Sequence, residues 1–314
     1  MGLYTPSDDE NFYWTNAALE SAASAIKFYA CKDWHNSGGD RTWLAPEVDF
    51  FFPNYPKRDA YLQQRSLDPG QYRIRQLGDG FELKNLMRVL PSRLKKEITL
   101  KSTKRFASAA NPLRHERGLA FGGLEYAGYS QYTSLELVGS SRSARTQVGL
   151  WNLVQMPHGG DLLIPTFSKT EPHHIFSTIG AIPKQDLAIT DHLIKYRMRQ
   201  NGEHKISIRA ATACGRVGYC YRSGKKWSLI IRNFVLNPSG EYVDGPWNEP
   251  DYLGFAIQAC NVKSGLGAFS ELEYHIPAIG RRTGRIRCDD EAQIWAFRGC
   301  KQQILEARKL LLGG

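Results

Sequence analysis

The feature that most constrains the fold is the alternation of polar and apolar residues in many short segments of the chain. Successive side chains of a β-strand point to opposite faces of a sheet, so a period of two residues predicts strands. The pattern runs through residues 71–77, 80–86, 93–106, 129–137, 147–154, 205–213, 227–236 and 254–262. Turns rich in glycine and proline separate several of these segments, which favours hairpins. We therefore expect a mostly β protein built from paired strands.

Two segments show helical rather than alternating spacing. Residues 289–312 begin with two aspartates, which favour a helix N-terminus, and carry apolar residues along one helical face, namely Ile294, Phe297, Ile304 and Leu311. This spacing predicts a C-terminal helix over 289–312. Residues 16–30 begin with Asn16, a typical N-cap, and predict a short helix that runs into a strand. The 314 residues contain no repeat and no low-complexity linker, so we expect a single domain over 1–314.

The charge and composition of the chain indicate which kinds of binding partner to expect. The net charge of +10 favours an anionic partner. The basic residues are scattered and form no nucleic-acid motif, and no apolar stretch is long enough to span a bilayer, so we expect neither a nucleic-acid nor a membrane partner. The acidic N-terminus lacks the pattern of a signal peptide, which predicts a cytoplasmic protein, although a chain with its leader removed would look the same. The pattern gives no indication of the oligomeric state.

Cofactor and metal motifs are also missing from the sequence. The six cysteines show no CxxC spacing, and His173, His174 and His192 have no recognisable metal-ligand spacing. The chain has no Walker loop, no Rossmann fingerprint and no G-x-S-x-G elbow. We therefore expect no metal and no cofactor, and we set aside nucleotide-dependent and serine-hydrolase chemistry.

The segment 34–52, WHNSGGDRTWLAPEVDFFF, combines charged and aromatic residues around a glycine turn. Pro46 keeps the run before it extended, so Arg41 and Trp43 are expected on one side of that run. A guanidinium beside an indole offers donors for hydroxyl or carboxylate groups and a flat apolar surface for a pyranose ring. We interpret Arg41, Trp43, His35 and Glu47 as substrate-binding residues. The structural alternative is a buried Arg41–Glu47 ion pair beneath a tryptophan in a β-sandwich core.

The segment 269–275, FSELEYH, carries candidate acid/base groups. Alternation places Glu271, Glu273 and His275 on one face of a strand. Neighbouring carboxyl groups raise one another's pKa, and such pairs often occur at active sites. The structural alternative is the solvated face of an edge strand. A second group lies in 147–160, where Trp151 and Gln155 are candidate binding residues and His158 begins an HGG tripeptide on a turn.

The order of three motifs, GGDRTWLAPE (38–47), VGLWNLVQMPHGG (148–160) and FSELEYH (269–275), resembles the aldose 1-epimerase, or galactose mutarotase-like, superfamily. The resemblance covers roughly residues 30–300. It implies a large antiparallel β-sandwich with a sugar bound in a cleft on its concave face. It also implies that Arg41 contacts the sugar, that Glu273, or Glu271 two residues earlier, is the base, and that His158 is the catalytic histidine. Trp151 and Asn152 stand where a second histidine is expected.

Three functions remain open at this point. The first is an epimerase-like enzyme, in which Glu273 removes the anomeric proton and His158 protonates the ring oxygen. The second is a lyase on uronate-containing saccharides, in which Arg or Lys neutralises the carboxylate and His or Tyr removes the C5 proton. The third is a non-catalytic sugar-binding protein with tryptophan platforms. All three predict a saccharide ligand, and the basic charge slightly favours an anionic one such as a uronate.

Overall fold

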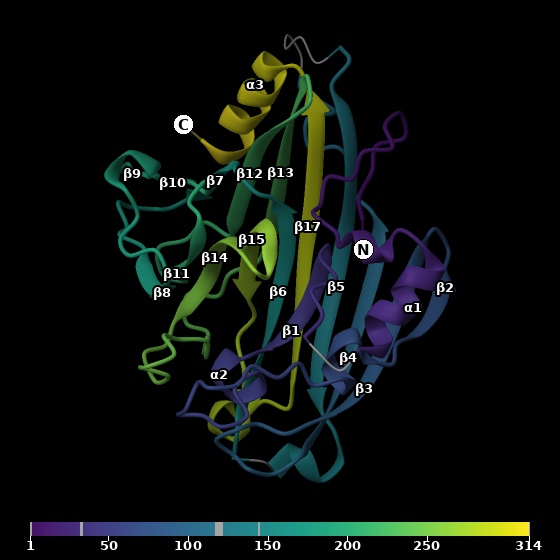
Figure 1. Cartoon of the computed structure of the whole chain (residues 1–314), viewed down its shortest axis with the longest axis vertical. Helices are drawn as coiled ribbons and strands as arrows, with labels where there is room; N and C mark the ends of the chain where they lie inside the picture. The colour runs from purple at the N-terminus through teal and green to yellow at the C-terminus, as the bar shows by residue number, and fades with distance from the viewer. Residues whose placement is uncertain (1, 32–33, 117–121, 144, 314) are drawn as a thin grey trace.

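The structure, a computed structural model, describes all residues except 1, 32–33, 117–121, 144 and 314 and the side chain of residue 281. Two large sheets pack face to face as a β-sandwich (Figure 1), and every strand pair among the described residues is antiparallel. The predicted mostly β character is confirmed. Among the described residues, no helix has the length and apolar character needed to cross a membrane.

The first sheet has seven strands, and β1 forms one of its edges. Its order is β1 (Asp40–Ala45), β6 (Gln147–Pro157), β15 (Gly267–His275), β14 (Phe255–Ser264), β11 (Gly202–Arg209) and β8 (His173–Ser177), and β16 (Ile279–Gly280) pairs with the far part of β6. Because β1 pairs only with β6, its second side faces away from the sheet.

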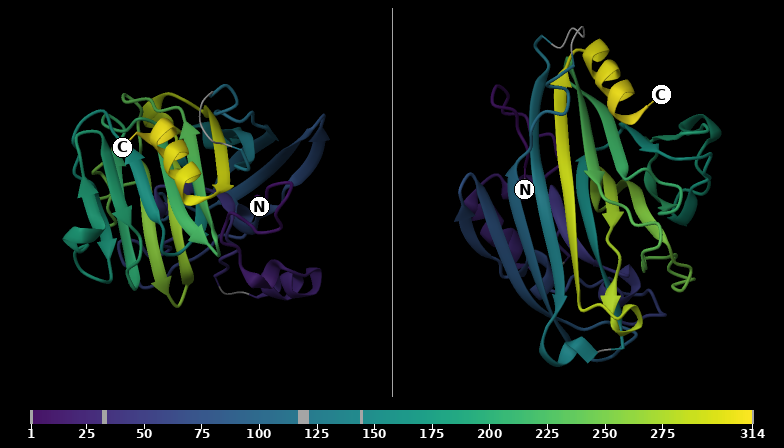
Figure 2. Two further views of the ribbon diagram at one scale, coloured as in Figure 1. Left: turned by 90° about the horizontal axis from the view of Figure 1, so that it is seen from above. Right: turned by 180° about the vertical axis from the view of Figure 1, so that it is seen from behind.

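The second sheet has ten strands and is longer than the first. Its order is β2 (Arg73–Leu77), β3 (Gly80–Val89), β4 (Ile98–Ser108), β5 (Glu125–Leu137), β17 (Arg287–Gly299), β13 (Lys226–Phe234), β12 (Arg216–Ser223), β7 (Asp161–Pro165), β10 (Leu193–Arg197) and β9 (Leu187–Ile189). The β2–β3 end of this sheet projects beyond the first sheet, near α1 (Ala22–Ala30) (Figure 2). An open edge of the sandwich therefore lies between β1 and the β2–β4 strands.

The core between the sheets is apolar and continuous. One cluster of buried side chains reaches from Phe12 to Ala296 and includes residues of both sheets, such as Leu44, Leu272 and Ile294. A second cluster lies on the outer face of the second sheet, beneath the C-terminal helix α3 (Lys301–Leu312). Figure 2 shows α3 lying along that outer face.

The predicted helix over 289–312 is wrong in its first half, because β17 runs through Gly299 and only residues 301–312 are helical. The strand is covered on both sides. Ile294 faces the core between the sheets, whereas Trp295 and Phe297 pack beneath α3. A strand that is apolar on both faces loses the alternation by which strands are recognised, so its apolar residues also matched a helical spacing.

The prediction for residues 16–30 is confirmed for the helix and wrong for the strand. Asn16 caps a short 3-10 turn, accepting a hydrogen bond from the backbone N–H of Ala18 at 2.9 Å, and Ser21 caps α1. Helix α1 continues to Ala30, and Ile26 is 70% exposed on its surface. The remaining helical segments are short: α2 (Glu47–Phe50), and turns at Ala17–Leu19, Ser66–Gly70, Gly139–Ser143, Lys184–Asp186 and Arg281–Thr283.

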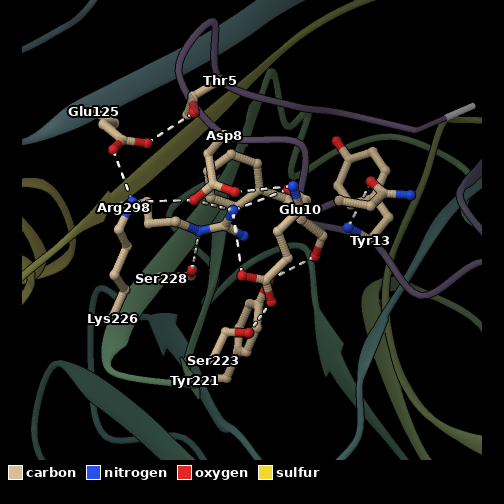
Figure 3. Close-up of polar contacts among 12 residues, drawn as sticks. Thr5, Asp8, Glu10, Tyr13, Glu125, Tyr221, Ser223, Lys226, Ser228 and Arg298 are labelled. Carbon is tan, nitrogen blue, oxygen red and sulfur yellow. Dashed lines mark hydrogen bonds and ion pairs between the residues drawn. The ribbon is translucent and has the colours of Figure 1, made fainter.

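The N-terminal segment is fixed to the second sheet by Arg298 of β17, a residue with no exposed surface (Figure 3). Its guanidinium donates to the carbonyl of Glu10 at 2.9 Å and to Ser228 Oγ at 3.1 Å, lies 3.3 Å from an Asp8 oxygen, and stacks on Phe12 at 4.2 Å. Lys226 on β13 pairs with the same Asp8 carboxylate at 3.1 Å. We call this group the Arg298 cluster.

Candidate functional site

The face of the first sheet that points away from the second sheet is polar and aromatic. In an antiparallel pair, opposed residues share a face, so the pairs Trp43–Trp151, Gln155–Glu271 and Gln258–Glu273 all lie on it. Its other members come from the same strands: Arg41 on β1, His275 on β15 and Lys205 on β11. The residues between them, such as Leu44 and Leu272, pack into the core. The predicted facing of Arg41 and Trp43 is confirmed.

Two loop segments cover this polar face. Glu47 at the start of α2 accepts hydrogen bonds from Tyr61 at 3.1 Å and from the indole of Trp247 at 3.0 Å. Its backbone N–H donates to Asp244 at 2.6 Å. Trp247 stacks on Phe176 of β8 with 4.4 Å between ring centroids. We call residues 47–61 and 244–247 the cover. Beneath it, Glu273 has no exposed surface and Lys205 is 2% exposed.

Lys205 is the cation at the centre of the face. Its Nζ lies 3.1 Å from Glu273 Oε2 and 3.5 Å from Glu47 Oε2. It also lies 4.3 Å from the centre of the Trp151 ring, a cation–π distance. Lys205 thus links the strand carrying Glu273 to the cover. We call Lys205 together with Glu47, Asp244, Glu271 and Glu273 the Lys205 cluster.

Arg41 is the second cation of the face, and it does not pair with Glu47. Its guanidinium lies 3.8 Å from Asp68, 3.9 Å from Glu271 and 4.4 Å from the centre of the Trp43 ring. The structural alternative of a buried Arg41–Glu47 pair is therefore wrong. The reason is that Glu47, one residue beyond Pro46, turns toward Lys205.

The Lys205 cluster contains more carboxyl groups than cations. Burial raises the pKa of Glu47, Asp244, Glu271 and Glu273 above their ordinary values, although Lys205 and Arg41 oppose the shift. The effect is large for Glu273, where burial and then the charge of Glu271 raise the pKa to about 8 against the attraction of Lys205. Burial therefore favours the protonated form of Glu273. A site with one protonated and one ionised carboxyl can donate and accept a proton at once.

Burial and the charges of the Lys205 cluster also shift the pKa values of Lys205 and His275. Burial alone would lower the pKa of Lys205, but Glu273, Glu47 and Asp244 together raise it well above its ordinary value. Burial, and then the charge of Lys205, lower the pKa of His275 well below its ordinary value. His275 Nε2 lies 2.9 Å from Gln258 Oε1. Lys205 is therefore charged and His275 neutral near pH 7.

Several buried polar atoms on this face have no hydrogen-bond partner among the described residues. They are both carboxylate oxygens of Glu273, Oε1 of Gln155, Nε1 of Trp151, Nε2 of Gln258, Nδ1 of His275, and Nε and Nη1 of Arg41. Of these atoms, Glu273 Oε2 has the Lys205 ammonium as an ion-pair partner at 3.1 Å. A buried polar group left unpaired costs about 1–3 kcal/mol, and such atoms also occur elsewhere in the described chain, among them Nη2 of Arg298. Donors and acceptors of this kind suit a polyhydroxylated ligand.

A cleft of about 500 Å³ opens at the free edge of β1. Arg41, Trp43 and Asp68 form one side of it, and the indole of Trp43 donates to Asp68 at 2.7 Å. The opposite side is formed by β2, β3 and β4 together with Tyr29 of α1. Arg41 and Trp43 belong to both the cleft and the polar face, so the two are adjacent. We call this space the edge cleft.

His158 does not join the polar face, and the predicted Glu273–His158 pair is not formed. His158 Nε2 lies 3.1 Å from Asn261 Oδ1 and 3.3 Å from the carbonyl of Gln200. Asn261 and Gln258 are three residues apart on β14 and so point to opposite faces, and Gln258 is the neighbour of Glu273. The turn that carries His158 directs it toward the other face of the sheet.

His35 is buried at the margin of the site, in contacts that hold the chain. Its backbone N–H donates to Gln63 at 2.9 Å, its Nδ1 lies 2.5 Å from Arg65, and its ring stacks on Tyr29. Of the nine residues predicted for the site, the structure brings seven together: Arg41, Trp43, Glu47, Trp151, Gln155, Glu271 and Glu273. The sequence analysis did not identify Lys205 or Asp244. A lysine in the middle of β11, directly before the alternating isoleucines Ile206 and Ile208, was the available signal for Lys205.

Two comparisons of the chain with known proteins found no match. No protein-family model matches the chain. No curated protein matches its sequence.

Proposed function

We propose that the protein is carbohydrate-active and catalyses aldose 1-epimerase-like acid/base chemistry on a sugar bound at the polar face. The observation that carries this proposal is the Lys205 cluster, in which Glu271 and Glu273 share one strand face and burial raises the pKa of both carboxyls. The resemblance of the three sequence motifs to the galactose mutarotase-like superfamily supports the same reading. The proposal includes a β-sandwich of the galactose mutarotase-like type.

Mutarotation requires one group that removes the anomeric hydroxyl proton and one that protonates the ring oxygen as the C1–O5 bond breaks. Glu273 is the proposed acid, because burial raises its pKa and favours its protonated form. Glu271 is the proposed base, because Arg41 at 3.9 Å and the amide of Gln155 at 2.7 Å stabilise its negative charge. The products of this step are an open-chain aldehyde, an ionised Glu273 and a protonated Glu271. Ring closure on the other face of C1 returns both protons.

This assignment differs from the expectation that Glu273 is the base and His158 the acid. Burial of Glu273 favours its protonated form, which makes it a donor in the ring-opening direction. By microscopic reversibility the two carboxyls exchange roles during ring closure. His158 has no part in the proposal.

Trp43 and Trp151 are the proposed apolar surfaces for the sugar ring. Their indoles meet edge to face with 5.1 Å between centroids, and each carries a cation against one face, Arg41 and Lys205 respectively. Pyranose rings pack their C–H groups on such aromatic surfaces. Both indoles are buried, so we propose that a sugar reaches them from the edge cleft or by displacement of the cover.

The test is the rate of anomer exchange, measured by NMR on a panel of neutral aldoses, uronates and sugar phosphates. We expect the protein to accelerate exchange of at least one sugar, and Glu273→Gln to lose a factor of about 10² to 10⁴ in rate. Glu97→Gln, at an exposed carboxylate, is the matched control, and His158→Asn should keep its rate. No acceleration of any sugar by the unmodified protein would refute the proposal.

A lyase acting on uronate-containing saccharides is the second candidate, and one observation favours it. Tyr29, Tyr72 and Arg41 line the same edge cleft, where an arginine can neutralise a uronate carboxylate and a tyrosine can remove the C5 proton. Burial raises the pKa of Tyr72 to about 12, which opposes its use as a base. The ultraviolet absorbance of an unsaturated uronate product separates this activity from mutarotation. Binding with neither signal would identify a sugar-binding protein.

A further inference from the structure

The deep end of the edge cleft contains a lysine that the proposed sugar chemistry does not use. Lys104 of β4 is 6% exposed and lines the cleft together with Phe81, Leu83 and Phe106. Its strand neighbour Leu83 shares its face, so the side chain points inward, between the sheets. Its Nζ lies 5.3 Å from the centre of the Phe106 ring, and no described residue forms an ion pair or hydrogen bond with it. A buried lysine without a paired carboxylate is uncommon.

Asp40 lines the same part of the cleft from the opposite sheet. Its side chain has no exposed surface, and its Oδ2 accepts a hydrogen bond from Tyr129 at 2.5 Å and lies 3.4 Å from Arg232 Nη2. Its Oδ1 has no hydrogen-bond partner among the described residues. The unpaired amine of Lys104 therefore belongs to a residue that lines a cavity large enough for a small ligand, whereas the Asp40 carboxylate is fully buried.

The surroundings favour the neutral form of this amine. Burial is the largest influence and lowers the pKa of Lys104 to about 8, against the attraction of Asp40 and with the repulsion of Arg232. A lysine at its ordinary value of 10.5 is almost wholly protonated at pH 7. At that pH the fraction of free amine at Lys104 is on the order of 10² times larger, and only the free amine is nucleophilic.

We propose that the edge cleft is a second ligand site, which takes a small aldehyde and binds it covalently as an imine on Lys104. The Lys104 nitrogen attacks the carbonyl carbon, a C–N bond forms, and the carbonyl oxygen takes up a proton to give a carbinolamine. Loss of that oxygen as water, with formation of C=N, completes the imine. The two N–H protons of the attacking amine leave in turn, the first to the carbonyl oxygen and the second to the departing hydroxyl. The sequence is redox-neutral and needs no further reactant.

Aromatic and aliphatic side chains, including Trp43, Tyr72 and Ile74, form part of the cleft walls. An open-chain aldose belongs to the aldehyde class, and the volume of the cleft admits one. The proposal does not depend on the chemistry at Glu273, because Lys104 and Asp40 face the core whereas Glu273 faces the cover.

The experiment uses the full chain with glycolaldehyde and sodium cyanoborohydride at pH 7, followed by peptide mapping over time. Lys84 and Lys101 of neighbouring strands, each about half exposed, are the internal controls. We expect Lys104 to be modified at least tenfold faster than either control, and Glu273→Gln to leave that rate unchanged. Lys104→Arg should remove the fast modification and leave the slower ones.

Faster modification of Lys84 and Lys101 than of Lys104 would overturn the proposal. The comparison is made within one unmodified protein, so it holds even if the Lys104→Arg variant does not fold. Equal rates at all three lysines would overturn it as well, because they would show that the cleft does not activate the amine.

Discussion

Arg298 and Lys205 are both buried cations surrounded by carboxylates, yet the two clusters differ in balance. Arg298 and Lys226 meet Asp8, Glu10 and Glu125 at a partly exposed rim, where Asp8 is 18% and Glu10 46% exposed (Figure 3). Lys205 meets Glu273 and Glu47 beneath the cover, with Asp244 and Glu271 close by. The first group is nearly neutral and solvated. The second has excess carboxyl groups, of which only Glu271 is partly exposed.

The direction of the carboxyl pKa shifts records this difference. A backbone hydrogen bond from Glu10 and then the ammonium of Lys226 lower the pKa of Asp8 to about 2. Burial raises the pKa of all four carboxyls near Lys205. Ion pairs that only hold the chain together favour the charged form, whereas a site for proton transfer keeps a carboxyl near its neutral form. We therefore interpret the Arg298 cluster as a structural ion-pair group and propose the Lys205 cluster as the site of proton transfer.

The largest expected effect comes from removing the central cation of each cluster. Lys205→Met leaves Glu273 and Glu47 buried without their partner, and we expect a loss of about 3–5 kcal/mol in the free energy of unfolding at pH 8. The loss should shrink at pH 5, because the carboxyls then take up protons. Arg298→Met should destabilise the protein with much less dependence on pH. Urea unfolding at pH 5 and pH 8 measures the loss of unfolding free energy in each variant. If that loss depends on pH equally in the two variants, the proposed difference between the two clusters is wrong.

Glu273→Gln sharpens the comparison, because glutamine mimics a protonated glutamate. The folded pKa is about 8 against an ordinary 4.5, so the stability contributed by the proton is present below pH 4.5 and lost as the pH rises through 8. We expect the variant to match the unmodified protein at pH 5 and to be more stable by about 1–3 kcal/mol at pH 9. Parallel stability curves from pH 5 to 9 would show that Glu273 is ionised throughout.

Arg41→Lys tests the second cation of the polar face. The variant keeps the charge but loses the planar guanidinium that stacks on Trp43 and donates to Asn36 at 3.2 Å. We expect a stability loss of about 1 kcal/mol, together with roughly tenfold weaker binding of the sugar found in the anomer-exchange panel. Melting temperature and affinity are measured on the same variant. A large stability loss with unchanged affinity would make Arg41 purely structural.

Asp8→Asn gives the smallest expected effect and the opposite pH dependence. Because the folded pKa of Asp8 is lowered from 3.8 to about 2, its contribution to stability is present above pH 3.8 and lost as the pH falls through 2. The variant should melt slightly below the unmodified protein at pH 7, with a difference that disappears at low pH. A variant more stable than the parent at pH 7 would contradict the structural assignment.

The sequence predicted the polar face more successfully than the groups that act across it. Alternation alone placed Arg41 with Trp43 and Glu271 with Glu273, because a strand fixes the face of each side chain locally. His158 follows the end of β6, where the turn rather than the strand period sets its direction, and it points to the other face.

Lys205 and Asp244 could not be placed from the sequence for a different reason. The cluster assembles residues from β11, β15 and two loops, so its geometry depends on strand order and on the cover rather than on local spacing. The helix prediction over 289–299 failed for a related reason. Strand β17 packs against the core on one face and against α3 on the other. Both faces are therefore apolar, and the polar–apolar alternation that identifies a strand is missing from its sequence.

The most direct test of this account is a titration of the glutamate carboxyl carbons by ¹³C NMR in labelled protein. The account predicts one glutamate resonance that titrates near pH 8 and is absent from the Glu273→Gln variant. Removal of Arg298 should leave that resonance in place, whereas removal of Lys205 should move its titration to still higher pH. If every glutamate carboxyl titrates near the ordinary value of 4.5, the Lys205 cluster holds no proton at neutral pH and the proposed acid is absent.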